Sequence, residues 1–269
     1  MTGAATIAPP RGRPPGAAWG SGGTARAVAP IVLGVSVVAV WQLIAGSGLV
    51  EAYLLPSPAA IGAEIVEFWP SMVSAGAITG LNALVGLVAG TLIGIIAALV
   101  ASTRRSLDGM LAPIVAALAV IPIVALAPVL NTMFGADSQT GRQLIAALAA
   151  FVPVFLNTAR GLRQTQPVHR DLLRSYAASN AQIMRTITLR TAAPFTFTGI
   201  RLASSLAVIS ALVAEYFGGP RGGLGGLIST SAASSAYPRA WAYVVAAIIL
   251  GLAFSLVASG LERLVSRRR

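Results

Sequence analysis

The stretch QTQPVHRDLLRSYAASNAQIMRTITLRTAAPFTFTG, residues 164–199, is the longest polar interruption in the hydrophobic part of this chain. It carries four arginines against a single acid, Asp171. Apolar residues recur in it at spacings of three and four, around residues 172–177 and again around 183–187, which predicts two short amphipathic helices. Ser179 and Asn180 interrupt this pattern and are residue types that cap a helix N-terminus. A basic helix-turn-helix between two apolar runs predicts a docking surface on the cytoplasmic side.

The composition of the chain indicates a membrane protein. Its 269 residues are 56% hydrophobic and 10% charged, whereas soluble domains carry about 25% charged residues. The net charge of +11 is spread over the ends of apolar runs rather than gathered on one face, which argues against nucleic-acid binding. Cysteine is absent and His169 is the only histidine. We therefore expect no catalytic residue, no metal site and no cofactor bound by this chain. The sequence also lacks the catalytic residues that an intramembrane enzyme would need.

Six apolar runs are candidates to cross a bilayer core, which needs roughly 20 helical residues. They cover residues 28–46, 75–101, 110–134, 143–158, 194–216 and 240–261. The expected fold class is an all-α membrane protein with about six transmembrane helices. The expected divisions are a disordered cytoplasmic tail at 1–27, a transmembrane domain at 28–264 that includes the loop 164–193, and a basic cytoplasmic tail at 265–269.

The distribution of arginines predicts the orientation of these spans. With six spans, fifteen arginines fall on the side of both termini and of the loop 164–193. Only Arg142, Arg221 and Arg239 fall on the other side, and Arg201 lies inside a span, near enough to the inner face for its side chain to reach the interface. The positive-inside rule then predicts that both termini and the loop are cytoplasmic.

Two segments on the predicted outer side have distinct patterns. Ile61, Ile65 and Phe68 lie at helical spacing and predict a short interfacial helix. Residues 217–238 are rich in glycine but lack the Lys-Ser/Thr and the preceding strand of a phosphate loop. We expect a flexible outer loop there, either wholly outside or dipping back toward the bundle.

Glycines and prolines distinguish the second and third spans. Five glycines of the second span are mostly four residues apart and predict a smooth face on which a neighbouring helix packs closely; they are Gly76, Gly80, Gly86, Gly90 and Gly94. Pro113, Pro122 and Pro128 interrupt the third span. Each removes a backbone hydrogen bond, so the span is expected inside the bundle, near a pathway.

Three polar residues in the spans are candidates for the transport pathway. Asn131 and Thr132 lie near the outer end of the third span, where they either line the pathway or form ordinary interhelical hydrogen bonds. Glu215 lies near the outer end of the fifth span, where it either lies at the outer interface or forms part of a gate or pathway.

The loop 164–193 resembles the cytoplasmic coupling loop of the permeases of binding-protein-dependent ABC importers. The family's pattern begins Glu-Ala-Ala and has a glycine after three further residues. Asp171 stands at the Glu position, Leu172 and Leu173 at the Ala positions, and Ala177 at the Gly position. Arg190 replaces the usual proline of this pattern. The departures put the strength of coupling in doubt, whereas the fold should survive because alanine at 177 can remain helical.

The likeness extends over about residues 54–264. It rests on Leu55-Pro56-Ser57-Pro58, Phe134-Gly135, Phe151-Val152-Pro153 and Ala214-Glu215 followed by Gly223-Leu224-Gly225. The chain is most similar to the branch that serves nitrate, sulfonates, taurine and the pyrimidine precursor of thiamine. The run Glu215-Tyr216-Phe217-Gly218-Gly219 is similar to members for the thiamine precursor or riboflavin-like compounds.

The resemblance implies an importer-permease fold with cytoplasmic coupling helices and three kinds of partner. These are a second permease copy, a cytoplasmic ABC ATPase dimer that uses the ATP, and an extracytoplasmic solute-binding protein. The residues expected at the ATPase contact are Asp171, Arg174, Tyr176, Ala177, Ser179 and Asn180. The alternative is an ATP-independent secondary carrier or channel, but the sequence shows no convincing inverted repeat and little intramembrane charge.

Overall fold

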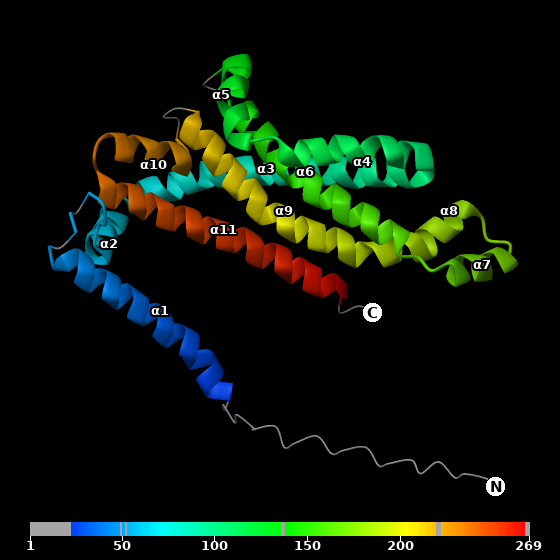
Figure 1. Cartoon of the computed structure of the whole chain (residues 1–269), viewed down its shortest axis with the longest axis horizontal. Coiled ribbons are helices and arrows are strands. Elements are labelled where there is room, and N and C mark those ends of the chain that lie inside the picture. The colour runs from blue at the N-terminus through cyan, green and yellow to red at the C-terminus, as the bar shows by residue number, and fades with distance from the viewer. Residues whose placement is uncertain (1–22, 49, 52, 136–137, 219–221, 267–269) are drawn as a thin grey trace, which may run out of the picture. The chain divides into compact units, whose positions relative to one another are not determined.

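The computed structural model describes residues 23–48, 50–51, 53–135, 138–218 and 222–266, and every regular element in these ranges is a helix (Figure 1). The tail predicted at residues 1–27 lies mostly outside them, as does the end of the basic tail at 265–269. The chain divides into two units, Met1–Glu51 and Ala52–Arg269. In the first unit, helix α1 (Gly23–Gly46) contains the apolar stretch Val28–Gly46, the same residues as the predicted first span.

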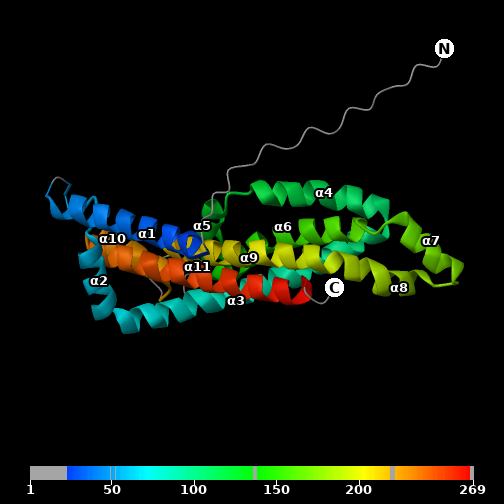
Figure 2. The same ribbon diagram turned by 90° about the horizontal axis from the view of Figure 1, so that it is seen from below.

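The second unit contains the remaining helices. They are α2 (Pro58–Glu67), α3 (Trp69–Thr103), α4 (Arg105–Val120), α5 (Ile123–Phe134), α6 (Thr140–Arg163), α7 (Pro167–Ser175), α8 (Asn180–Ile183), the π-helix η1 (Met184–Thr188), α9 (Leu189–Phe217), α10 (Leu224–Ala233) and α11 (Tyr237–Ser266). Helix α6 packs between α3 and α9, and α11 packs on the other side of α9. Helix α10 lies at one end of this bundle and α7 and α8 lie at the other (Figures 1 and 2).

Close packing around α6 depends on glycines of its neighbours. A Cβ atom on Gly90 of α3 would lie 2.9 Å from the Cβ atom of Ala150, and one on Gly199 of α9 would lie 2.9 Å from the carbonyl oxygen of Pro153. Real Cβ atoms do not approach so closely, so both helices reach α6 only because these positions lack a side chain. The predicted smooth face of the second span is confirmed for Gly86, Gly90 and Gly94, but Gly76 faces open space.

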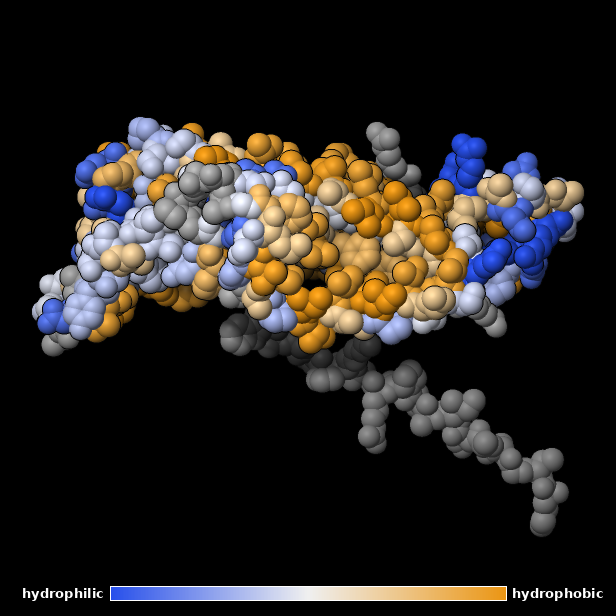
Figure 3. All heavy atoms as spheres, turned by 90° about the horizontal axis from the view of Figure 1, so that it is seen from above, coloured by the Kyte–Doolittle hydropathy of each residue, from blue (hydrophilic) through white to orange (hydrophobic). Residues whose placement is uncertain are grey.

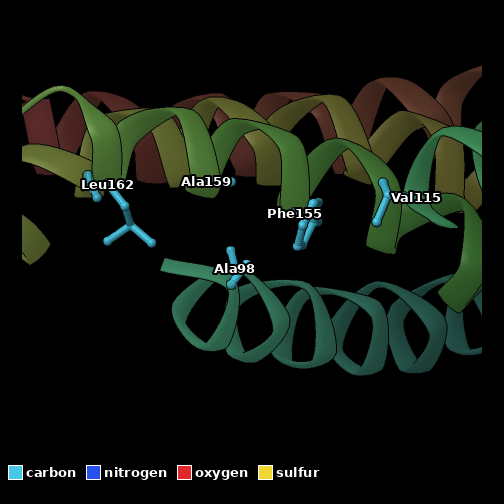
Figure 4. Packing of buried hydrophobic residues seen from close by; sticks show 7 residues of the cluster. Ala98, Val115, Phe155, Ala159 and Leu162 are labelled. Carbon is cyan, nitrogen blue, oxygen red and sulfur yellow. The ribbon is translucent and has the colours of Figure 1, made fainter. Parts of the chain in front are cut away.

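Small and apolar side chains complete the interior near the α7–α8 end. Ala98 of α3 faces Phe155 and Ala159 of α6, with Val115 of α4 beside them (Figure 4). Apolar side chains dominate the surface over the long helices, whereas hydrophilic ones gather at the α7–α8 end (Figure 3). This distribution is that of helices which cross a lipid core and end in water.

The third predicted span is two helices rather than one. Helices α4 and α5 meet at an angle of 98°. Ile121 has an extended backbone (φ −61°, ψ 123°) because the ring of Pro122 disfavours the helical conformation in the residue before it. Pro113 and Pro128, in contrast, remain inside their helices. In the described ranges, five helices are long and apolar enough to span a membrane, or six if the bent pair counts as one span, so the all-α membrane fold is confirmed.

The two segments that were predicted on the outer side differ in outcome. The short helix expected around Ile61 is confirmed as α2, and the hydroxyl of Ser57 caps it by accepting from the N–H of Ala60 at 3.2 Å. The flexible loop expected at 217–238 is wrong for residues 224–233, which form helix α10 with Leu224, Gly225 and Gly226 buried. The glycines there serve close packing: a Cβ atom on Gly225 would lie 2.8 Å from the Cβ atom of Glu215.

Candidate functional site

The turn between α7 and α8 is built from two standard helix ends. At the end of α7, the N–H of Ala177 donates to the carbonyl of Arg174 (2.9 Å) and that of Ala178 donates to the carbonyl of Leu173 (3.0 Å). These two bonds form a Schellman motif, and Ala177 occupies its left-handed position with φ 56°. The expectation that Ala177 remains helical is therefore wrong. The position requires a left-handed backbone, which glycine adopts more easily than alanine.

Ser179 begins the second helix with a capping box, as its residue type predicted. Its hydroxyl accepts from the N–H of Gln182 at 3.3 Å, and its own N–H donates to the side-chain oxygen of Gln182 at 2.7 Å. Asn180 is the first residue of α8 rather than a cap. From there the chain continues through η1 into α9 without leaving a helical conformation.

The α7–α8 segment, residues 167–183, exposes both apolar and charged side chains. Tyr176 is 76% exposed, Val168 72% and Leu172 53%. Arg174 and Asp171 form a loose ion pair of 3.4 Å, with both side chains more than 60% exposed. All six residues predicted at the ATPase contact lie exposed on this segment; they are Asp171, Arg174, Tyr176, Ala177, Ser179 and Asn180. An exposed apolar patch rimmed by charge is typical of a surface that another protein covers.

The opposite end of the second unit contains a buried polar network around Glu215. Its side chain is 1% exposed, so a solvated position at the outer interface is wrong. One carboxylate oxygen accepts from the hydroxyl of Thr79 at 2.7 Å and from the N–H of Gly225 at 3.2 Å. The other accepts from the side-chain amide of Asn82 at 3.1 Å. Thr79 also accepts from the N–H of Leu224 at 2.9 Å, so the network fixes the first turn of α10 to α3 and α9.

A second layer connects this network to α6. Arg142 is 1% exposed and donates to the side-chain oxygen of Gln139 at 2.9 Å. The same oxygen accepts from Asn82 at 2.9 Å. Arg142 also lies near enough to Glu215 for electrostatic attraction. A buried carboxylate is stable only when donors and an opposite charge compensate for its lost hydration, and this network supplies both.

The sequence singled out Glu215 but missed its partners Thr79, Asn82, Gln139 and Arg142. Thr79 and Asn82 are polar interruptions of a long apolar run, which was the available signal. Arg142 was only counted among the arginines of the predicted outer side, and nothing in its local sequence reveals that it is buried.

The two other pathway candidates lie on α5. Thr132 is exposed, and its hydroxyl donates to the carbonyl of Pro128 in its own helix at 2.9 Å, so an interhelical hydrogen bond is wrong for it. Asn131 is 9% exposed, and its side-chain NH₂ has no hydrogen-bond partner among the described residues. Arg201 of α9 is ion-paired with Glu262 of α11 at 3.2 Å rather than extended alone toward the interface.

Within the described parts of the chain, no three His, Cys, Asp or Glu side chains lie close enough together to hold a metal ion.

The chain is similar to known transport proteins over most of its length. The family model "Binding-protein-dependent transport system inner membrane component" matches residues 90–269. The chain is 29% identical to the probable ABC transporter permease protein of Haemophilus influenzae over 197 residues, which are 73% of this chain and 80% of that protein. It is 34% identical to the riboflavin transport system permease protein RibX of Chloroflexus aurantiacus over 166 residues, 61% of this chain and 60% of that protein.

A third relative has a different substrate in its name. The chain is 27% identical to the formylaminopyrimidine transport permease protein ThiX of Halalkalibacterium halodurans over 198 residues, 73% of this chain and 78% of that protein. The family match covers well over half of the chain and includes α6, the α7–α8 segment and the Glu215 network apart from its α3 residues before 90. The chain therefore belongs to the binding-protein-dependent ABC importer permeases and is a multi-pass inner-membrane protein.

Proposed function

We propose that this chain is the transmembrane subunit of an ATP-driven importer and that the α7–α8 segment is its contact with a cytoplasmic ABC ATPase. The observation that carries the proposal is the exposure of that segment. Its polar atoms are ordered by a Schellman motif and a capping box, while Tyr176, Val168 and Leu172 remain uncovered. A rigid turn that presents apolar side chains suits insertion into a groove of a partner.

The wider assembly that we propose is the one that the family resemblance implies. Two copies of the chain form the pathway, with both termini and the α7–α8 segment on the cytoplasmic side and α10 on the outer side. A binding protein delivers the solute at the outer side. ATP binding closes the ATPase dimer, and movement of the coupling helices opens the pathway outward by rigid-body motion of packed helices. No cofactor is bound by the permease itself, and ATP is bound and hydrolysed by the partner.

The test is co-purification of a P-loop ATPase with the detergent-solubilised protein. Replacing residues 171–180 by a Gly/Ser linker should abolish co-purification. A finer pair of variants is Tyr176→Ser and Tyr53→Ser. Both tyrosines are more than half exposed, but Tyr176 follows α7 whereas the ring of Tyr53 lies 6.4 Å from that of Tyr237 at the start of α11. Only Tyr176→Ser should reduce ATPase binding and uncouple ATP hydrolysis from transport.

Replacing Ala177 by glutamate tests the same contact at the turn itself. The turn backbone is unchanged because alanine already adopts φ 56° there, so the added charge acts on the partner. Normal transport by this variant would place the contact elsewhere. If the protein instead purifies without an ATPase and moves a solute in liposomes without ATP, it is a secondary carrier or channel.

The proposed substrate is a small polar solute. Relatives are named for riboflavin and for formylaminopyrimidine, and the resemblance adds sulfonates and nitrate. Uptake into proteoliposomes that contain the permease, the ATPase and the binding protein should be measured with each of these four solutes. Saturable, ATP-dependent uptake of one of these solutes supports the proposed substrate class of small polar solutes. Uptake of none of them contradicts it.

A further inference from the structure

A basic cleft lies between the α7–α8 segment and the nearby ends of α3, α4 and α6. Its volume is about 860 Å³. Its charged lining residues are Arg104, Asp108, Arg163, Arg170 and Arg174. Four cations and one anion line the space, so its electrostatic potential is positive and attracts an anion.

The internal ion pairs do not neutralise this charge. Asp108 pairs with Arg163, and Arg174 pairs loosely with Asp171 outside the cleft. Among the described residues, neither Arg104 nor Arg170 has a carboxylate partner. Two guanidinium groups are therefore available to a ligand.

Two buried polar atoms in the cleft wall have no partner within the described chain. Thr165 is 7% exposed, and its hydroxyl makes no hydrogen bond. The Nε atom of Arg170 is buried and is also without a partner. A buried polar group that lacks a hydrogen bond is destabilising, and native proteins contain few of them. Both groups can donate, so each indicates an acceptor that the described residues do not supply.

Two helix N-termini add to the same effect. Helix α4 begins beside Arg104 and α7 begins at Pro167, and both Arg104 and Pro167 line the cleft. Neither helix has a side-chain cap at its N-terminus. The positive ends of both helix dipoles therefore lie at the cleft and favour a bound anion.

We propose that the basic cleft binds a phosphate group. Planar guanidinium groups, a threonine hydroxyl and helix N-termini are the donors that proteins use for oxyanions with several acceptor oxygens. The volume exceeds that of a phosphate ion, so a phosphate ester fits, carried by a phospholipid headgroup or by a free phosphate compound. Because α7 and α8 form one wall, the ligand holds the α7–α8 segment against the bundle. This inference does not depend on the proposed ATPase contact.

The experiment uses the purified full-length chain alone in an uncharged detergent. Inorganic phosphate is titrated at constant ionic strength, with chloride as the balancing anion, and the unfolding temperature is followed. In parallel, native mass spectrometry measures retention of phosphatidylglycerol against phosphatidylcholine. The variants are Thr165→Val/Arg170→Gln and the isosteric Thr165→Val, and the matched control is Arg190→Gln, which removes one charge from an exposed position outside the cleft.

A saturable rise in unfolding temperature, weakened at least tenfold in the double variant and retained in Arg190→Gln, supports a free phosphate source. Selective retention of phosphatidylglycerol, lost in the double variant but kept in the control, supports a lipid source. Thr165→Val should weaken whichever response is found by a smaller factor without loss of folding. Equal responses of the double variant and Arg190→Gln to both probes would overturn the proposal. Because no ATPase is present, that failure is separate from failure of the proposed function.

Discussion

The two ends of the second unit treat their polar groups in opposite ways. At the α10 end, Glu215 is fully buried and its oxygens accept from Thr79, Asn82 and the backbone of Gly225. At the α7–α8 end, Tyr176 is exposed and Arg170 has a buried donor without a partner. The Glu215 carboxylate is satisfied by donors of its own chain, whereas the second end leaves groups that only a ligand or another protein can satisfy. Stability is therefore expected to depend mainly on the first end, and assembly mainly on the second.

The sharpest way to break this comparison is Glu215→Ala. The substitution removes the acceptor of three donors and the electrostatic attraction between Glu215 and Arg142. We expect a loss of about 3–5 kcal/mol, as for removal of one partner from a buried charged network. The measurement is thermal unfolding in detergent, with a fall of roughly 10 °C. Glu67→Ala, at an exposed position, is the control and should change stability by less than about 0.5 kcal/mol. Equal effects of the two variants would mean that the network contributes no stability.

Thr79→Val tests one connection of the network with a smaller change. The methyl group fills the space of the hydroxyl, but Glu215 loses a donor and the N–H of Leu224 loses its acceptor. A loss of about 1–3 kcal/mol is expected because two buried groups become unpaired. Thr132→Val is the matched control, since its exposed hydroxyl bonds only within its own helix. If both valine variants unfold alike, the threonine does not tie α10 to α3.

The smallest expected change in stability concerns the Schellman turn, which occurs at both ends of the second unit. Ser235, at the end of α10, repeats the Schellman geometry of Ala177: its φ is 61°, and the N–H of Ala236 donates to the carbonyl of Ser231 at 2.9 Å. Glycine at either position should stabilise the protein by about 0.5–1 kcal/mol, because relief of left-handed strain outweighs the added chain entropy of glycine.

Measuring Ala177→Gly beside Ser235→Gly separates turn strain from function. Both should raise the unfolding temperature by a similar small amount. Only Ala177→Gly should also change the coupling of ATP hydrolysis to transport. A coupling change in Ser235→Gly as well would show that turn rigidity acts at both ends.

The sequence predicted those features that local pattern decides. The lengths of the apolar runs predicted α3, α6, α9 and α11, and the residue type at 179 predicted the cap of α8. The break between α4 and α5 was not located, because Pro113, Pro122 and Pro128 are equivalent in sequence and only tertiary packing selects Pro122.

The Glu215 network was missed because its members lie far apart in the sequence. Thr79 and Glu215 are separated by 136 residues, and no local pattern pairs them. The conformation of Ala177 was missed for a related reason. Alanine is a strong helix former, and its left-handed backbone is imposed by the short turn between the end of α7 at Ser175 and the start of α8 at Asn180.

The unbroken helical run Asn180–Phe217 connects the α7–α8 end of the second unit with its α10 end. Its 38 residues extend about 55 Å at the rise of an α-helix. A tilt of about 5° around one end displaces the other by about 5 Å over that length. Because hydrogen bonds hold Glu215 to α3 and to the start of α10, a rigid tilt of this run about the Glu215 end would displace Asn180 most. The π-helical turn Met184–Thr188 lies close to the Asn180 end of this run. Because π-helical turns are weaker than α-helix, the run would bend there before the hydrogen bonds of Glu215 broke.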